Sequence, residues 1–107
     1  MLKQKYVKSR KVCKVTFELP KKELPPEVEA QEVKVVGDFN NWDANATPMK
    51  RIKSTGAYKI VVELEPEKVY QFRYLINDDC WLNDATASAY VSNGFGSQNG
   101  VVKTSMN

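Results

Sequence analysis

Gly37-Asp38-Phe39-Asn40-Asn41-Trp42 is the most informative part of the sequence, because it ends a run of β-branched residues and carries a tryptophan into a polar loop. The residues before it alternate as in a strand, with Val33 and Val35 on one face. Glycine and asparagine tolerate the positive φ angles of turns. The pattern predicts a strand over residues 32–39 that stops here, so that Trp42 lies beyond the sheet.

Strand signals recur at short intervals along the rest of the chain. A strand over residues 12–19 ends at Pro20, and residues 21–31 form a loop because Pro25-Pro26 cannot donate to a ladder. Residues 70–76 alternate plainly, which puts their aromatic side chains on a core face. We also expect strands over residues 48–52, 58–64, 81–82 and 101–104, a hairpin turn at 77–80, a mixed segment with one helical turn at 84–92 and a loop at 93–100. This pattern is typical of an all-β sandwich.

Composition limits the classes of protein. The 107 residues suit one domain, and no apolar run reaches the roughly 20 residues of a membrane span. The N-terminus lacks the apolar core of a signal peptide, so we expect a cytoplasmic protein with reduced cysteines, Cys13 being a core residue. Histidine is absent, which removes the commonest general base and metal ligand. We therefore predict no cofactor and no metal.

The acidic residues do not indicate an enzyme. Glycosidases use paired carboxyl groups at a defined separation, whereas the aspartates here have the spacing of turns, in which Asp bonds nearby backbone amides. Calcium binding is poorly supported as well, because the Asp-x-Asp-x-Asp-Gly pattern with its distal Glu is missing. The residues concerned are Asp38, Asp43, Asp78, Asp79 and Asp84.

The first eleven residues form a basic arm on an otherwise acidic chain. Six cations precede the first acidic residue, Glu18, while the whole chain carries a net charge of +3. Such an arm could bind RNA or a lipid surface. We favour a solvated segment that leads into an edge strand, where lysines discourage aggregation. Neither nucleic acid nor a membrane is therefore predicted as a partner.

Trp42 and Trp81 both sit among Asp and Asn residues, in polar loops. Sugar rings have an apolar face of C–H groups and a rim of hydroxyls, so aromatic rings stack on the face and amides bind the rim. Arg73 is on the outward face of its strand, and Trp81 comes one hairpin turn later. The alternative is that each tryptophan folds down as a lid on the sandwich. Two rings with converging polar groups favour sugar binding.

Several blocks of sequence together resemble a known family. They are Val35 to Trp42, Pro48-Met49, Tyr70 to Tyr74, Trp81 to Asp84, Phe95-Gly96, and Asn99 before Val101-Val102. The chain resembles a family 48 carbohydrate-binding module, the immunoglobulin-like early-set domain at the N-terminus of isoamylases and branching enzymes. It is also similar to the glycogen-binding domain of the AMP-activated protein kinase beta subunit. The resemblance implies an immunoglobulin-like β-sandwich.

The resemblance also implies a set of sugar-binding residues. Trp42 and Trp81 would be the two stacking rings, and Asn99 would contact sugar hydroxyls. Arg73 replaces a lysine that hydrogen-bonds the glucan, and Phe95 replaces a leucine that pushes through the sugar ring. Arginine keeps the donor but has a planar fork, so its geometry differs from that of lysine.

Together these features predict a non-catalytic module that binds glycogen, starch or maltooligosaccharide. A lone site of this kind is weak, so retention on a polymer requires multivalency through a homo-oligomer or a glycogen-metabolising enzyme as partner. The strongest alternative is a protein-interaction module of the same fold that docks on such an enzyme or regulator without binding sugar. A third hypothesis is an anionic partner bound by the basic arm, with affinity that collapses in salt.

Overall fold

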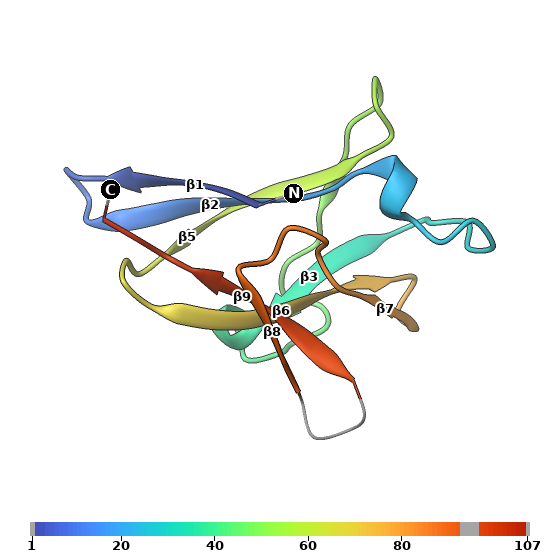
Figure 1. Cartoon of the computed structure of the whole chain (residues 1–107). Coiled ribbons are helices and arrows are strands. Elements are labelled where there is room, and N and C mark those ends of the chain that lie inside the picture. The colour runs from blue at the N-terminus through green and yellow to red at the C-terminus, as the bar shows by residue number, and fades with distance from the viewer. Residues whose placement is uncertain (1, 93–96, 107) are drawn as a thin grey trace.

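Two antiparallel sheets make up the computed structural model, which describes residues 2–92 and 97–106 (Figure 1). Sheet A has the strand order β1-β2-β5-β4, and sheet B has the order β3-β6-β9-β8, with β7 pairing on β6. The strands are β1 (Leu2–Val7), β2 (Val12–Leu19), β3 (Val33–Gly37), β4 (Lys50–Arg51), β5 (Tyr58–Leu64), β6 (Val69–Ile76), β7 (Cys80–Leu82), β8 (Ala89–Ser92) and β9 (Gln98–Lys103), with two 3-10 turns, η1 (Lys21–Glu23) and η2 (Asp38–Asn40).

The core lies between the two sheets and comes from alternate residues of each strand. From sheet A, Cys13, Val15 and Phe17 are fully buried, and from sheet B the rings of Phe72 and Tyr74 meet them. The ring centroids of Phe17 and Phe72 are 5.0 Å apart in an edge-to-face arrangement. The predicted all-β class and immunoglobulin-like sandwich are therefore confirmed, as are the strand at 12–19 and its inward face.

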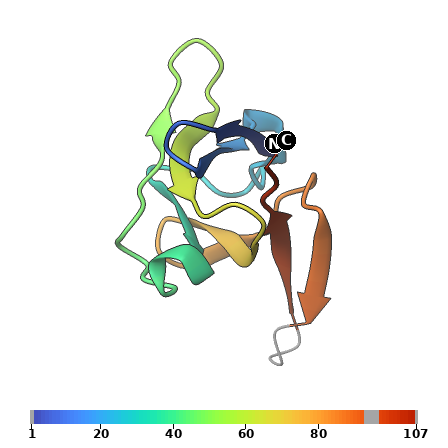
Figure 2. The same ribbon diagram turned by 90° about the vertical axis from the view of Figure 1, so that its left-hand side faces the viewer.

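The register defines the outer face of sheet B. Gln71 lies opposite Val101 and Leu75 lies opposite Trp81, so these side chains share the face turned away from the core. Arg73 lies between Gln71 and Leu75 in β6, and it is on the same face because every second residue of a strand points the same way. Turned by 90°, the structure shows the β8–β9 hairpin projecting from the body of the sandwich, as it does in the first view (Figures 1 and 2).

The turn after β3 differs from the expected strand end. The strand stops at Gly37, and Phe39 lies in the turn η2 instead. Its ring still packs inward, with its centroid 5.4 Å from that of Phe17 and 6.2 Å from that of Tyr70. The Phe39 ring therefore packs against the core although it lies outside the strand, because the short 3-10 turn also directs it inward.

Three segments have more strand than the sequence predicts. Residues 2–7 of the basic arm form β1, the edge strand of sheet A, with Lys5 opposite Lys14. Residues 89–92 form β8, within the segment 84–92 that was expected to be mixed with one helical turn, and β9 begins at Gln98 rather than at residue 101. All three gain their hydrogen bonds from a neighbour distant in sequence or from a hairpin partner, and local patterns reveal such partners poorly.

The described residues contain no helix long and apolar enough to cross a membrane, and no cluster of His, Cys, Asp and Glu suited to hold a metal ion. Cys13 and Cys80 are free thiols. The Cys13 thiol donates to Gln4 Oε1 at 3.2 Å, and burial raises its pKa. This pair ties the edge strand β1 to β2.

Candidate functional site

The loop that carries Trp42 is shaped by Gly37 and Asn40. A Cβ atom on Gly37 would collide with the Gln71 carbonyl oxygen and lie 2.8 Å from Phe72 Cβ, so only glycine allows β3 to approach β6 here. Asn40 Oδ1 accepts the Gly37 amide at 3.0 Å, and its Nδ2 donates to the Val35 carbonyl at 3.1 Å. These contacts turn the chain, and Asn41 and Trp42 both take positive φ angles of 57°.

Asp38 holds the indole of Trp42 and joins it to sheet B. Its Oδ1 accepts the Trp42 Nε1 proton at 2.9 Å, while its Oδ2 accepts the backbone amide of Gln71 at 2.8 Å. The side chain thus continues the β3–β6 ladder one step beyond Gly37 and fixes a half-buried ring at the end of the sheet. Sequence reasoning assigned Asp38 to a turn and missed this positioning role.

Trp81 and Arg73 are in direct contact on the outer face of sheet B. The guanidinium carbon of Arg73 lies 5.5 Å from the centre of the Trp81 ring, within the range of a cation–π interaction. The Trp81 side chain nevertheless remains 42% exposed. An exposed flat ring braced from one side is a surface on which the apolar face of another ring can stack.

Two buried side-chain polar atoms have no hydrogen-bond partner within the described part of the chain. They are Nε of Arg73 and Oδ1 of Asn83, two residues after Trp81. Buried polar atoms are nearly always paired, so an unpaired donor and an unpaired acceptor in one region indicate a ligand or water.

Asn99 is buried on the neighbouring strand β9, at 8% exposure. Its Nδ2 donates to Gln71 Oε1 at 3.1 Å. Because Phe72 lies opposite Gly100 in an antiparallel pair, the next step along the ladder puts Arg73 beside Asn99. The side chain of Gln71, which the sequence did not single out, therefore connects Asn99 to the strand that carries Arg73.

Lys34 ties together the two loops that carry the tryptophans. It is 7% exposed, and its Nζ donates to Asn45 Oδ1 in the Trp42 loop at 3.3 Å and to Asp78 Oδ1 in the turn before Trp81 at 2.7 Å. Glu32 Oε1 is a further partner at 2.7 Å. The hydrogen bonds to Asp78 and Glu32 raise the pKa of Lys34, which keeps it charged. A lone lysine in an alternating strand carried no sequence signal for this role.

The segment after Trp81 is anchored by the buried carboxylate of Asp84. It accepts the hydroxyl of Tyr74 at 2.5 Å and both the amide and the hydroxyl of Thr86, at 2.7 and 2.6 Å. Burial, followed by the negative charge of Asp84 and this hydrogen bond, raises the pKa of Tyr74. The aspartate is thus a structural acceptor inside the fold.

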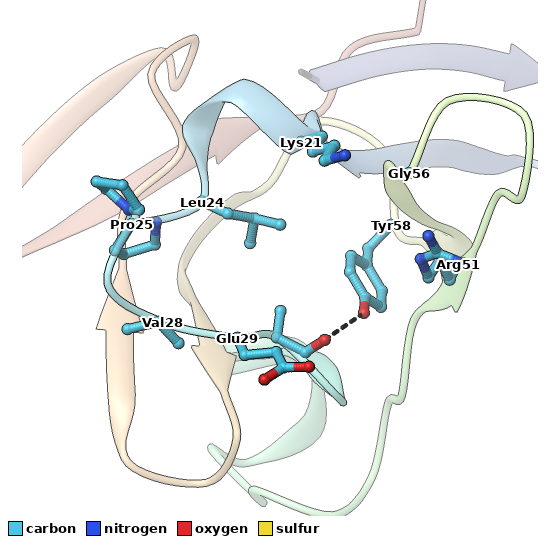
Figure 3. Close-up of a pocket in the computed structure, with 10 residues that line it drawn as sticks. Lys21, Leu24, Pro25, Val28, Glu29, Arg51, Gly56 and Tyr58 are labelled. Atoms are coloured by element: carbon cyan, nitrogen blue, oxygen red, sulfur yellow. Dashed lines mark hydrogen bonds between the residues drawn. The ribbon is translucent and has the colours of Figure 1, made fainter.

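Of the predicted site residues, Arg73 and Trp81 touch, and Asn99 shares their sheet face on the neighbouring strand. Trp42 is connected to the same face through Asp38 and Gln71. Phe95 lies outside the described residues. A separate cavity of about 310 Å³ opens between the loop after η1 and the β4–β5 end of sheet A, with neither tryptophan in its lining (Figure 3). Leu24 and Val28 line its apolar part, and Tyr58 donates to the Ala30 carbonyl at 3.3 Å.

A β-sandwich with exposed and half-buried tryptophans on one sheet and its edge loops has the form of a surface-binding module. The family described as carbohydrate-binding module 48 (isoamylase N-terminal domain) matches residues 28–90. This is more than half of the chain, and the chain belongs to that family. The resemblance drawn from the sequence motifs is thereby confirmed.

The chain is also similar to a part of two 1,4-alpha-glucan branching enzymes. The chain is 40% identical over 47 residues to the 1,4-alpha-glucan branching enzyme GlgB of Halothermothrix orenii, a match that covers 43% of this chain and 8% of the enzyme. The branching enzyme of Pseudomonas syringae pv. syringae is 43% identical over 47 residues, covering 43% of this chain and 6% of the enzyme. The matched part is thus less than a tenth of the length of these relatives.

Among solved structures, ferric enterobactin esterase from Salmonella typhimurium superposes with a TM-score of 0.76. The superposition covers 98% of this chain and 34% of the esterase, at 12% sequence identity. At that identity the likeness concerns the fold alone.

Proposed function

We propose that this protein is a single β-sandwich domain that binds α-glucan chains, such as glycogen, starch or maltooligosaccharides, without cleaving them. Trp42 and Trp81 stack on the apolar faces of glucose units, while Arg73 and Asn99 bond hydroxyls. Phe95 is proposed as a further contact. Membership of a carbohydrate-binding family and likeness to parts of two 1,4-alpha-glucan branching enzymes support α-linked glucose as the ligand.

The main support for the proposal is the environment of Trp81. The residue is 42% exposed although it is large and hydrophobic, and the Arg73 guanidinium carbon lies 5.5 Å from the ring centre. The guanidinium of Arg73 therefore brings N–H donors next to this exposed ring. A stacking surface beside a charged donor matches a sugar ring, whose hydroxyl oxygens accept hydrogen bonds.

The platform is open, so the affinity of one site is expected to be low. An aromatic contact contributes about 1 kcal/mol beyond its buried area, and association has a large entropic cost. A dissociation constant on the order of 0.1 to 1 mM follows. Retention on a glucan polymer then depends on multivalency, through self-association or through a glycogen-metabolising enzyme that carries or binds the module.

Tryptophan fluorescence titrated with maltoheptaose tests the proposal. We expect a saturable change in the wild-type protein that is lost in Trp81→Ala and in Trp42→Ala, with melting temperatures within a few degrees of wild type. Val61→Ala is the matched control, because Val61 is 49% exposed on the other sheet. Retention on immobilised glycogen gives a second readout that does not depend on the remaining indole. Unfolding of both tryptophan variants, or unchanged glycogen retention, would show that the rings are lids of the core.

Absence of catalysis is tested separately. We expect no release of reducing sugar from starch, glycogen or pullulan by highly purified protein, because the chain has no histidine and Asp84 is consumed by structural hydrogen bonds. Sustained release that one Asp→Asn substitution abolishes would contradict this part of the proposal.

A further inference from the structure

The basic residues of this protein are concentrated in the segments that form sheet A. Residues 2–24 and 50–64, which supply β1, β2, β4, β5 and their connections, carry twelve of the sixteen Lys and Arg residues but only three of the thirteen Asp and Glu residues. The rest of the chain, which includes sheet B and the candidate sugar site, holds the other ten acidic residues. Sheet A is therefore the basic side of the molecule.

The outer face of sheet A contains two pairs of lysines that lie directly opposite each other. Lys5 pairs with Lys14 across β1 and β2, and Lys50 pairs with Lys59 across β4 and β5. Lys3 is on the same face, opposite Thr16. Like charges directly opposite in a sheet destabilise it. The fold thus tolerates repulsion at two places on one face.

Neighbouring acids relieve this repulsion only in part. Glu63 lies opposite Lys14 on β5, but its carboxylate is engaged by Arg10. Glu18 lies opposite Lys59. Within the described residues, none of the five lysines on this face forms an ion pair. A binding partner that brings negative charge would remove the repulsion and gain attraction together.

We propose that the outer face of sheet A is a docking surface for an acidic polypeptide segment of a partner protein. Lys3 and Lys5 are two residues apart on a strand, which spaces their side chains by about 6.6 to 6.8 Å. Alternate side chains of an extended polypeptide have the same repeat, so its carboxylates can face successive lysines. Val61, opposite Thr16 and 49% exposed, supplies an apolar contact between the charges.

The composition of the face favours a polypeptide over other polyanions. Single-stranded nucleic acids are bound on platforms of aromatic side chains, whereas the aromatic residues of β1, β2 and β5 that the structure describes point to the core side of the sheet. Tyr6, opposite the buried Cys13, and Tyr58, opposite the buried Leu19, are examples. Membrane interfaces similarly favour aromatic anchors, which this face lacks among its described residues.

The test uses an alternating glutamate–threonine decapeptide with a fluorescent label, followed by anisotropy at about 0.15 M ionic strength. We expect saturable binding that weakens about tenfold in the variant Lys5→Glu/Lys14→Glu. The matched control is Lys68→Glu/Lys103→Glu, which changes the charge equally on the other half of the chain and should alter affinity less than twofold. Maltoheptaose binding should be the same in both variants, which separates this surface from the sugar site.

A stability measurement distinguishes docking from a merely structural role. Lys5→Glu alone replaces a repulsive pair by an attractive one, so its melting temperature should rise while peptide affinity falls. Equal loss of affinity in both double variants would overturn the proposal, because the binding would then follow net charge alone. Tighter binding of polyuridylate RNA, or of phosphatidylcholine vesicles containing phosphatidylglycerol, that the Lys5/Lys14 variant abolishes would also overturn it. Absence of any binding by wild type would identify the face as solvated surface.

Discussion

Replacing Asp38 by alanine tests whether the Trp42 ring is held in place before a ligand arrives. The substitution removes two hydrogen bonds at once, from Trp42 Nε1 at 2.9 Å and from the Gln71 amide at 2.8 Å. The indole would therefore gain rotamer freedom while the rest of the sandwich keeps its core.

The size of the effect follows from the exposure of these bonds. A typical hydrogen bond contributes a net 0.5 to 1.5 kcal/mol, and both donors can bind water once Asp38 is gone. We expect a loss of about 1 to 2 kcal/mol in the free energy of unfolding, which lowers the melting temperature by roughly 5 to 15 °C in a domain of this size. Ordering the freed ring on binding costs about 0.5 to 1.5 kcal/mol, or roughly 2- to 12-fold in glucan affinity.

Thermal unfolding and a maltoheptaose titration measure the two effects on the same protein sample. The matched control is Asp43→Ala, which removes the same charge from the same loop and one bond, to the Asn45 amide at 2.9 Å. It should leave glucan affinity within about twofold of wild type. If Asp38→Ala and Asp43→Ala bind glucan equally well, Asp38 does not prepare Trp42 for the ligand and the reasoning fails.

Three further substitutions probe the site and its support. Arg73→Ala should weaken glucan binding by roughly 1 to 2 kcal/mol, and Arg73→Lys should regain much of that loss. Binding should depend little on salt, because the ligand is neutral. Unchanged binding by Arg73→Ala together with strong salt dependence would instead indicate that the basic arm is the binding site. Gly37→Ala should lower the free energy of unfolding by about 3 kcal/mol, since its Cβ would press on the backbone of β6, as denaturant titration will measure. Tyr74→Phe should cost about 1 to 3 kcal/mol by removing a buried donor from Asp84. The pKa of Tyr74 is raised in the folded state, so above pH about 10 only the unfolded state releases this proton. The free energy of unfolding of the wild type should therefore fall there by up to about 1.4 kcal/mol per pH unit more than that of Tyr74→Phe. Parallel pH profiles of the two proteins would contradict this.

Strands with clear alternation could be located from their own residues. Val12–Leu19 and Val69–Ile76 place every second side chain in the core, and a period of two appears in the sequence regardless of which strands lie beside them. The edge strand Leu2–Val7 has no comparable signal, because its lysines, glutamine and tyrosine resemble a solvated arm. Its strand conformation depends on pairing with β2, and the hairpin contact is what decides it.

The residues around Trp42 could be recognised as a turn from the sequence, but the role of each residue could not. Glycine at position 37 was interpreted by its tolerance of positive φ, whereas its backbone is extended and the requirement is the closeness of β6. Asp38 was interpreted as a local turn acceptor, yet one of its two oxygens bonds Gln71, thirty-three positions away. Contacts across a sheet depend on register, and no local pattern of residue types contains it.

The family, the all-β class and the five residues proposed to bind sugar could all be predicted from the sequence, because turn chemistry, alternation and family motifs are local properties of the chain. How the site residues are held in place depends on the fold. It alone revealed Lys34 bonded to both tryptophan loops, the contact between Arg73 and Trp81, and the opposed lysines of sheet A. Each of these contacts joins segments that strand pairing brings together. The energy of such a contact depends on distance in space, which separation along the chain does not encode.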